Sequence, residues 1–184
     1  MTISSRTTRL LAAAGGLALA VGLAGPAAAE TTTFDDGADA TASLNDILRV
    51  KVNHGVGQVA VRISFTDLRK KSAGGPASIG IFLDTRPGRK GPEFRLGSGL
   101  NEGTDFQLMR MKNWKPVGNP KTCEHDLDLQ FKRNRLVFKV ARDCIGTPDA
   151  VRIGAKMTDQ FDGSHPVHDW MKGPRRWTSS VTSG

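Results

Sequence analysis

The densest group of side chains able to bind a metal lies near the C-terminal end, in the stretch DQFDGSHPVHDW. Its carboxylates, Asp159, Asp162 and Asp169, could supply the oxygen ligands that Ca²⁺ prefers, and His165 and His168 would suit a mixed site. The spacing matches no EF-hand. The alternative is a polar loop in which Asp, Gly, Ser and Pro form turns. The sequence leaves both interpretations open, with Ca²⁺ as the candidate ion and no other cofactor expected.

A second acidic group begins the expected domain. It consists of Asp35, Asp36 and Asp39, with Asp46 a little further on. The two ends of a domain often lie close together. The two acidic groups could therefore share one cation, and a calcium-dependent adhesion domain is one function that the sequence allows.

Two tryptophans lie in loops among cations and turn residues. These are Trp114 in KNWKPVG and Trp170 in HDWMKG. Exposed tryptophan rings can stack on sugar rings, so both are candidate platforms for a carbohydrate; the alternative is that they anchor their loops. Trp177 falls in an expected strand and is expected in the core. The absence of tyrosine from the sequence counts against a large sugar platform.

A basic loop follows the apolar run SIGIFL. Its sequence is DTRPGRKGPEF, with Arg86, Arg89 and Lys90 between prolines that stiffen the chain and glycines that let it turn. The three cations are candidate contacts for an anionic ligand. The alternative is a solvated connection between two strands.

Sequence motifs of the common enzyme classes are missing. The sequence contains no GxSxG, HExxH, P-loop or dinucleotide fingerprint. We therefore expect a non-catalytic protein without catalytic residues. Carboxylates that hydrolyse glycosides need only meet in space, so a secreted hydrolase using loop carboxylates such as Asp162 and Asp169 is the alternative.

The first 29 residues predict a secretory signal peptide. Arg6 and Arg9 precede an apolar run from Leu10 to about Leu23, and small residues follow at 27–29. The run is shorter than the roughly 20 residues of a membrane span. We expect a secreted, extracellular, monomeric protein with one domain at residues 30–184 and no membrane span. Without its leader the chain keeps an excess of cations, which favours anionic surfaces over any specific nucleic acid.

Two cysteines, Cys123 and Cys144, lie in the exported part, where a disulfide is the default. They flank LDLQF and LVFKV, two alternating strands joined by KRNR. A hairpin that pairs Leu129 with Phe138 also places the cysteines opposite each other. We therefore expect a bridge, closing about 22 residues and contributing roughly 3 kcal/mol in the chain-entropy model. Two lone cysteines are no zinc signature.

Most of the remaining sequence alternates with period two, which predicts strands. ILRVKVN and QVAVRISF are expected to pair across HGVG, with Val52 facing Val59. Residues 31–44 suggest an entry segment with turns. Further strands are expected in ASIGIFLD, EFRL, DFQLMRM, AVRIGAKM and RRWTSSV. Eight or nine short strands predict an antiparallel β-sandwich, jelly-roll or immunoglobulin-like, with a barrel as the alternative.

The order of DILRVKVNH, QVAVRISFTDL, IGIFLDT, FKVARDCIG and VRIGAKM resembles a group of small secreted proteins of Gram-positive bacteria without assigned activity. Their sandwich is similar to family 9 carbohydrate-binding modules and to DOMON domains, which bind haem or sugar. The family 9 modules clamp a terminal sugar between two tryptophans, and the resemblance implies this role for Trp114 and Trp170. The expected function is a secreted binding or structural module that contacts carbohydrate or an anionic cell-envelope polymer.

Overall fold

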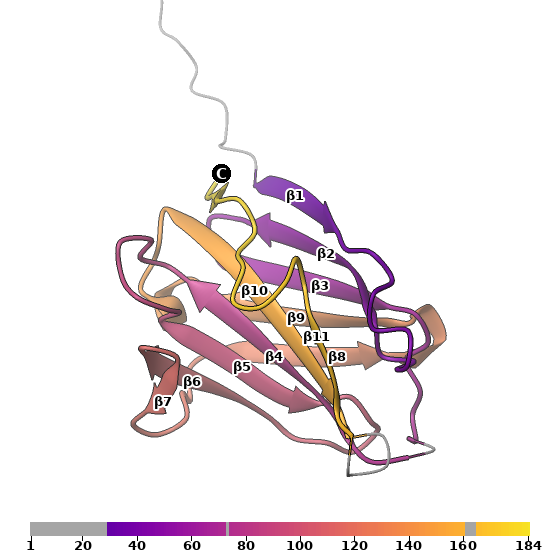
Figure 1. The fold of residues 1–184 in the computed structure, drawn as a ribbon. Helices are drawn as coiled ribbons and strands as arrows, with labels where there is room; N and C mark the ends of the chain where they lie inside the picture. Colours follow the sequence, from indigo (N-terminus) through magenta and orange to yellow (C-terminus); the bar gives the residue numbers. More distant parts are fainter. Residues whose placement is uncertain (1–28, 73, 161–164) are drawn as a thin grey trace, which may run out of the picture.

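The computed structural model describes residues 29–72, 74–160 and 165–184 (Figure 1). Nearly all regular structure in these residues is β, and the strands form two antiparallel sheets with one shared core. The expected antiparallel β-sandwich with one disulfide is confirmed. The proposed leader, apart from its last residue, and Asp162 lie outside the described residues.

The first sheet has five strands in the order β1-β2-β3-β9-β8 (Figure 1). Its strands are β1 (Glu30–Asp35), β2 (Ile47–His54), β3 (Gln58–Phe65), β8 (His125–Gln130) and β9 (Arg135–Ala141). A 3₁₀ turn, η1 (Phe131–Arg133), joins β8 to β9, and another, η2 (Asp143–Ile145), follows β9. Side chains alternate between the two faces of each strand, so every second residue of β2, β3 and β9 enters the core.

The second sheet runs in the order β11-β10-β4-β5-β6-β7, and the short β12 pairs with the start of β10. Its strands are β4 (Ala77–Asp84), β5 (Phe94–Gly99), β6 (Phe106–Lys112), β7 (Lys115–Val117), β10 (Ala150–Asp159), β11 (Val167–Trp170) and β12 (Val181–Thr182). No helix among the described residues is long and apolar enough to cross a membrane.

The core lies between the two sheets and is mostly aliphatic. The first sheet contributes Val and Ile side chains from β2 and β3, together with Phe138 at the middle of β9. The second contributes the inward residues of β4 and β10, such as Ile81 and Ile153, which are fully buried. The apolar positions predicted from period-two alternation therefore form the interior.

The register expected for the β2–β3 hairpin is wrong by two residues. Val52 pairs with Val61, and His54 takes the place opposite Val59. The connection is shorter than expected, since Gly55 donates its amide to the carbonyl of Gln58. An irregularity near the start of β2 then turns Ile47, instead of Leu48, into the core.

The expected register of the β8–β9 hairpin is also wrong by two residues. Leu129 pairs with Leu136 instead of Phe138, because the chain forms η1 where the expected strand continued. The expected disulfide between Cys123 and Cys144 is nevertheless confirmed. It forms outside the ladder, because η2 brings Cys144 to a Cα–Cα distance of 5.6 Å from Cys123.

Both ends of the domain differ from the sequence expectation. The segment expected to contain only turns begins with β1, which pairs along its whole length with β2. The prediction of a strand at residues 175–181 is wrong, since the strand there, β12, contains only Val181 and Thr182. The two ends meet because the amide and hydroxyl of Thr182 donate to the carboxylate of Glu30.

His54 lies beneath this junction. It is fully buried, and its Nδ1 is 3.0 Å from the carbonyl oxygen of Val181. Its Nε2 has no hydrogen-bond partner among the described residues. Burial is the main cause that lowers the pKa of His54 below its usual value, and the nearby Arg142 adds to it.

We expect wild-type protein to lose stability relative to a His54→Gln variant as the pH falls below about 6.5. The folded pKa is lowered, so the neutral ring stabilises the fold fully above the unfolded pKa, and this stabilisation is lost as pH falls toward the folded pKa. Urea unfolding of both proteins between about pH 8 and about pH 5 measures the difference. If the free energies of unfolding of the two proteins differ by the same amount at every pH in this range, His54 does not contribute to the pH dependence of stability.

Candidate ligand-binding site

An aromatic cluster covers part of the outer face of the second sheet. Phe82 in β4 points away from the core between the inward Ile81 and Leu83, and Trp170 ends β11. Loops bring in the other two rings, Trp114 between β6 and β7 and Trp177 before β12. The cluster therefore collects side chains from four separate parts of the chain.

The four rings contact one another directly. Phe82 stacks on Trp170 with centroids 5.6 Å apart, and Trp114 stacks on Trp177 at 5.3 Å. Trp114 meets Trp170 edge to face at a centroid distance of 6.1 Å. Such distances are those of aromatic pairs in contact. Trp114 and Trp170 therefore touch each other edge to face and do not lie as two parallel plates.

A cation lies over each ring of the cluster. The pairs are Arg95 over Phe82, Arg152 over Trp177, Lys156 over Trp170 and Arg175 over Trp114, with charge-to-centroid distances of 5.4–5.8 Å. Cations at such distances are attracted by the ring quadrupole. The outer face is thus both aromatic and positively charged. The three tryptophans are half-buried and Phe82 is buried.

Glycines make room for the rings on the sheet surface. A Cβ at Gly80 would lie 2.9 Å from Nε of Arg95 and 3.3 Å from the ring of Phe82. A Cβ at Gly154 would lie 3.3 Å from the ring of Trp177. Side chains at these positions would therefore crowd the aromatic and guanidinium groups and force them to shift.

Trp114 connects the aromatic cluster to the basic loop. It sits in the two-residue turn between Lys112 and Lys115, at a φ of 67° that bulky residues rarely adopt. Its ring packs on Gly91, where a Cβ would come within 2.8 Å of it. The ring contacts therefore hold the basic loop beside the β6–β7 hairpin.

A groove of about 400 Å³ lies between the basic loop, β6 and η2. Its size is that of a small-ligand site. Five cations and two acids are among the residues that line it: Arg86, Arg89, Arg110, Lys112, Lys121, Glu93 and Asp143. Lys90 is exposed in the same loop but does not line the groove. We call this feature the basic groove.

The cations of the basic groove outnumber its acids and are not ion-paired with them among the described residues. None of the four ion pairs within the described residues includes a groove side chain. Glu93 instead accepts the backbone amides of Thr85 and Arg86. Asp84, which precedes the loop, pairs with Arg152 on the outer face. Positive charge thus remains available to a ligand in the groove.

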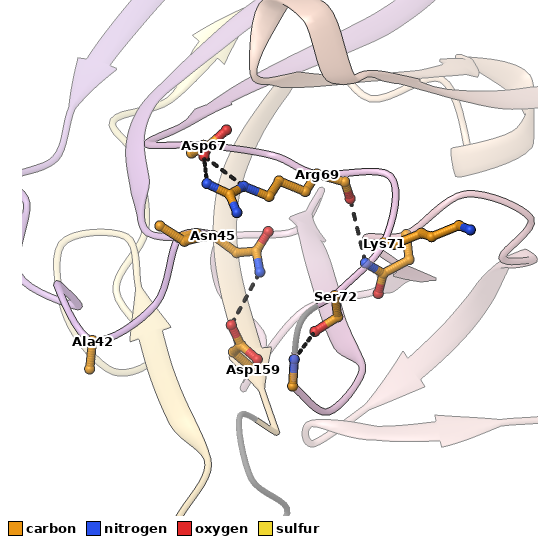
Figure 2. A pocket seen from close by; sticks show the side chains of 10 residues that line it. Ala42, Asn45, Asp67, Arg69, Lys71, Ser72 and Asp159 are labelled. Atoms are coloured by element: carbon orange, nitrogen blue, oxygen red, sulfur yellow. Dashed lines mark hydrogen bonds and ion pairs between the residues drawn. The ribbon is translucent and has the colours of Figure 1, made fainter.

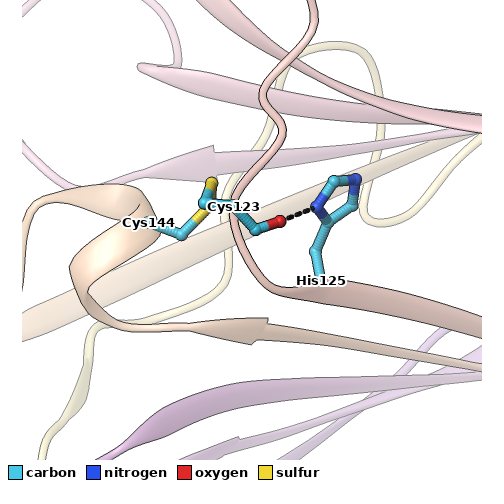
Figure 3. Close-up of side chains that lie close together, drawn as sticks. All are labelled: Cys123, His125 and Cys144. Carbon is cyan, nitrogen blue, oxygen red and sulfur yellow. Dashed lines mark hydrogen bonds between the residues drawn. A yellow bond between two sulfur atoms is a disulfide. The ribbon is translucent and has the colours of Figure 1, made fainter.

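The cysteine–histidine group is not a metal site. Cys123, His125 and Cys144 lie close together (Figure 3), but the two sulfurs form the disulfide. Thiolates, which bind metals, are therefore absent. His125 places its Nδ1 2.6 Å from the carbonyl oxygen of Cys123. A groove of about 660 Å³ passes His125, but its charged residues are Glu124, Asp126 and Lys139, so it carries no excess of positive charge.

A smaller hollow lies between the segment that precedes β2, the loop that follows β3 and the end of β10 (Figure 2). Its volume of about 90 Å³ is well below the roughly 300 Å³ of the smaller ligand sites. Its polar side chains bind one another, since Arg69 pairs with Asp67 and Asn45 donates to Asp159. This hollow is therefore no candidate for a sugar.

Asp159 and Asp169, the two described acids of the predicted calcium loop, have different partners. Asp159 ends β10 and accepts hydrogen bonds from Ser43 and Asn45. Asp169 lies in β11 and faces the interior, where it joins Asp39 and Asp46 from the N-terminal acidic group. Two members of the expected shared cluster are thus brought to Asp169.

Burial raises the pKa of Asp169 to about 7. The neighbouring carboxylates of Asp39 and Asp46 raise it further, while the hydrogen bond from the amide of Ile47 acts in the opposite direction. Like charges buried together disfavour ionisation. Asp169 as a whole is only 2% exposed.

Several site residues carried no visible signal in the sequence. Phe82 belongs to an apolar strand and looks like a core residue, and Trp177 was expected in the core. Arg110 and Lys112 alternate with apolar residues in β6 and look like solvated positions. These residues are distant in the sequence and can be assigned to a surface site only because the fold brings their loops and strands together.

Comparisons with known proteins add no family to this picture. No protein-family model matches the chain, and no curated protein and no solved structure matches it either. The function is therefore inferred from the geometry of the site.

Proposed function

We propose that this domain is a secreted, non-catalytic module that binds an anionic polymer of the cell envelope, such as an acidic polysaccharide. The observation that carries the proposal is the basic groove, with five cations that enter none of the ion pairs of the described residues. The leader-like N-terminal sequence and the disulfide support an extracellular location.

The chemistry of the groove fits repeated negative charges. Arg86, Arg89 and Arg110 carry planar guanidinium groups, which bind carboxylates and phosphates through paired hydrogen bonds. The groove is open to solvent at the surface, so it suits a segment of a long chain. The aromatic cluster adjoins it through Trp114 and extends a positively charged surface over the second sheet.

The first test is binding to immobilised polyuronate, to poly(glycerol phosphate) and to a neutral glucan. We expect both anionic polymers to retain the protein and the neutral glucan to let it pass through. Screening shortens the range of electrostatic attraction from about 30 Å at 0.01 M salt to about 3 Å at 1 M, so high salt should release the protein from both polymers. Arg86→Gln/Arg89→Gln should weaken binding at least about tenfold, which corresponds to about 1.4 kcal/mol.

Lys90→Gln is the matched control, because it removes one charge from the same loop but not from the groove. It should leave the affinity nearly unchanged. Equal losses in both variants would mean that only net charge matters. Salt-resistant retention of the protein on the neutral glucan would contradict the proposal and indicate stacking on the tryptophans instead. Preference between the two anionic polymers would identify the charged group.

A further inference from the structure

Three carboxylates from distant parts of the sequence meet at the edge of the sandwich. Asp39 lies in the loop after β1, Asp46 directly precedes β2, and Asp169 lies in β11. One carboxylate oxygen from each lies within 4.8 Å of the others. Asp46 and Asp169 are buried, at 1% and 2% exposure, whereas Asp39 is exposed. We call these residues the aspartate cluster.

Hydrogen bonds account for only part of the buried oxygens. Asp46 accepts the amide of Ala40 at 2.9 Å, and Oδ2 of Asp169 accepts the amide of Ile47 at 2.6 Å. Oδ1 of Asp169 is buried and has no hydrogen-bond donor among the described residues. Buried polar atoms are nearly always satisfied in folded proteins. This oxygen therefore indicates a missing partner that is neither a backbone amide nor a side chain of this part of the chain.

That partner is expected to be positively charged. None of the ion pairs within residues 29–72, 74–160 and 165–184 includes a member of the aspartate cluster. Buried charges in proteins are paired or coordinate metals. Three carboxylates whose oxygens lie this close together, one of them with an orphaned oxygen, offer the donor set of a hard divalent cation.

We propose that Asp39, Asp46 and Asp169 hold one Ca²⁺ ion. Calcium binds oxygens at about 2.3–2.6 Å, so two of its ligands can lie up to about 5 Å apart. The separation of the cluster oxygens, at most 4.8 Å, fits this span. Magnesium binds at about 2.0–2.1 Å and demands near-octahedral geometry. Calcium accepts more ligands and looser geometry, and water would complete its shell.

The ion would connect the two sheets at their edge. Asp46 leads into β2 of the first sheet, and Asp169 belongs to β11 of the second. Asp169 is followed directly by Trp170, whose ring lies in the aromatic cluster on the outer face. Calcium would therefore fix β11 from the inside and, through it, the position of Trp170.

The test is isothermal titration of the metal-stripped protein with CaCl₂ alone. We expect one Ca²⁺ per chain and a higher melting temperature in its presence. Asp39→Asn should weaken calcium binding at least about tenfold. This variant is preferred because Asp39 is exposed, so its folding should not suffer, whereas Asp169→Asn changes a buried position.

Asp35→Asn is the matched control, since Asp35 is a nearby exposed carboxylate that pairs with Arg49 outside the cluster. It should bind calcium as the wild type does. The proposal is overturned if wild-type protein shows neither heat nor a melting shift with Ca²⁺, or if Asp39→Asn binds as tightly as wild type. Tighter binding of Mg²⁺ than of Ca²⁺ would overturn the choice of ion. Polymer binding is measured separately, so either proposal can fail alone.

Discussion

Replacing Phe138 with alanine is expected to lower the free energy of unfolding by about 3–5 kcal/mol. Phe138 is fully buried at the middle of β9, the strand that joins β3 to β8. Its ring packs between the two sheets, and its pairing partners are Val61 and Leu127. The sandwich cannot collapse around the lost ring without moving both neighbouring strands, so a cavity remains. Urea unfolding followed by tryptophan fluorescence measures the loss.

Lys139→Ala provides the control for this prediction. Lys139 is the next residue of the same strand and points to solvent. Its replacement changes strand propensity but no core packing, so the free energy of unfolding should shift by less than about 0.5 kcal/mol. A similarly small loss for Phe138→Ala would mean that β9 does not pack as described.

Loss of the Cys123–Cys144 bridge is expected to cost about 3 kcal/mol of stability. The bridge closes a loop whose ends are 21 positions apart, and the unfolded chain gains the corresponding freedom when the bond is absent. A Cys123→Ala/Cys144→Ala double variant, compared with oxidised wild type by denaturant unfolding, measures this difference. Equal stability of the two proteins would contradict the prediction.

The double variant also offers an internal control. A reducing agent should lower the stability of wild type to about that of the variant and leave the variant unchanged. Because η2 contributes Cys144 and Ile145 to the wall of the basic groove, the variant should also bind anionic polymer less tightly than wild type. Undiminished binding would show that the groove keeps its shape without the bridge.

The fold could be predicted because its strands follow one simple rule. One face of each strand is buried, so apolar residues alternate with polar ones along β2, β3 and β9. The disulfide could be predicted because both cysteines lie just beyond the ends of one hairpin. These features depend on local sequence alone.

The register could not be predicted from the same alternation. A slip of one residue turns the apolar face outward, whereas a slip of two residues returns it to the core. From Val50 onward, the hairpin with Val52 opposite Val59 and the observed hairpin with Val52 opposite Val61 therefore bury the same Val and Ile side chains. Loop geometry decides between them, through the short turn at Gly55 and the 3₁₀ turn that starts at Phe131.

A candidate site could be predicted only where two distant segments were expected to meet. The N-terminal and C-terminal acidic groups were expected to meet because the ends of a domain often lie close together, and Asp39 and Asp46 do lie beside Asp169. The same reasoning could not place Asp159, which turns to Ser43 and Asn45. Nor could it show that Trp114, in a turn, and Trp177, far along the chain, stack on one another. Such contacts depend on the packing of loops over the finished sheet.

The glycines beneath the aromatic cluster have a consequence for tracing the ancestry of this domain. A Cβ at Gly80 would press on Arg95, and a Cβ at Gly154 would press on the backbone oxygen of Arg176 and on the ring of Trp177. Relatives that keep this outer surface are therefore expected to keep small residues at both positions. A search for such relatives should weigh one glycine in each of two adjacent strands together with tryptophans in the loops.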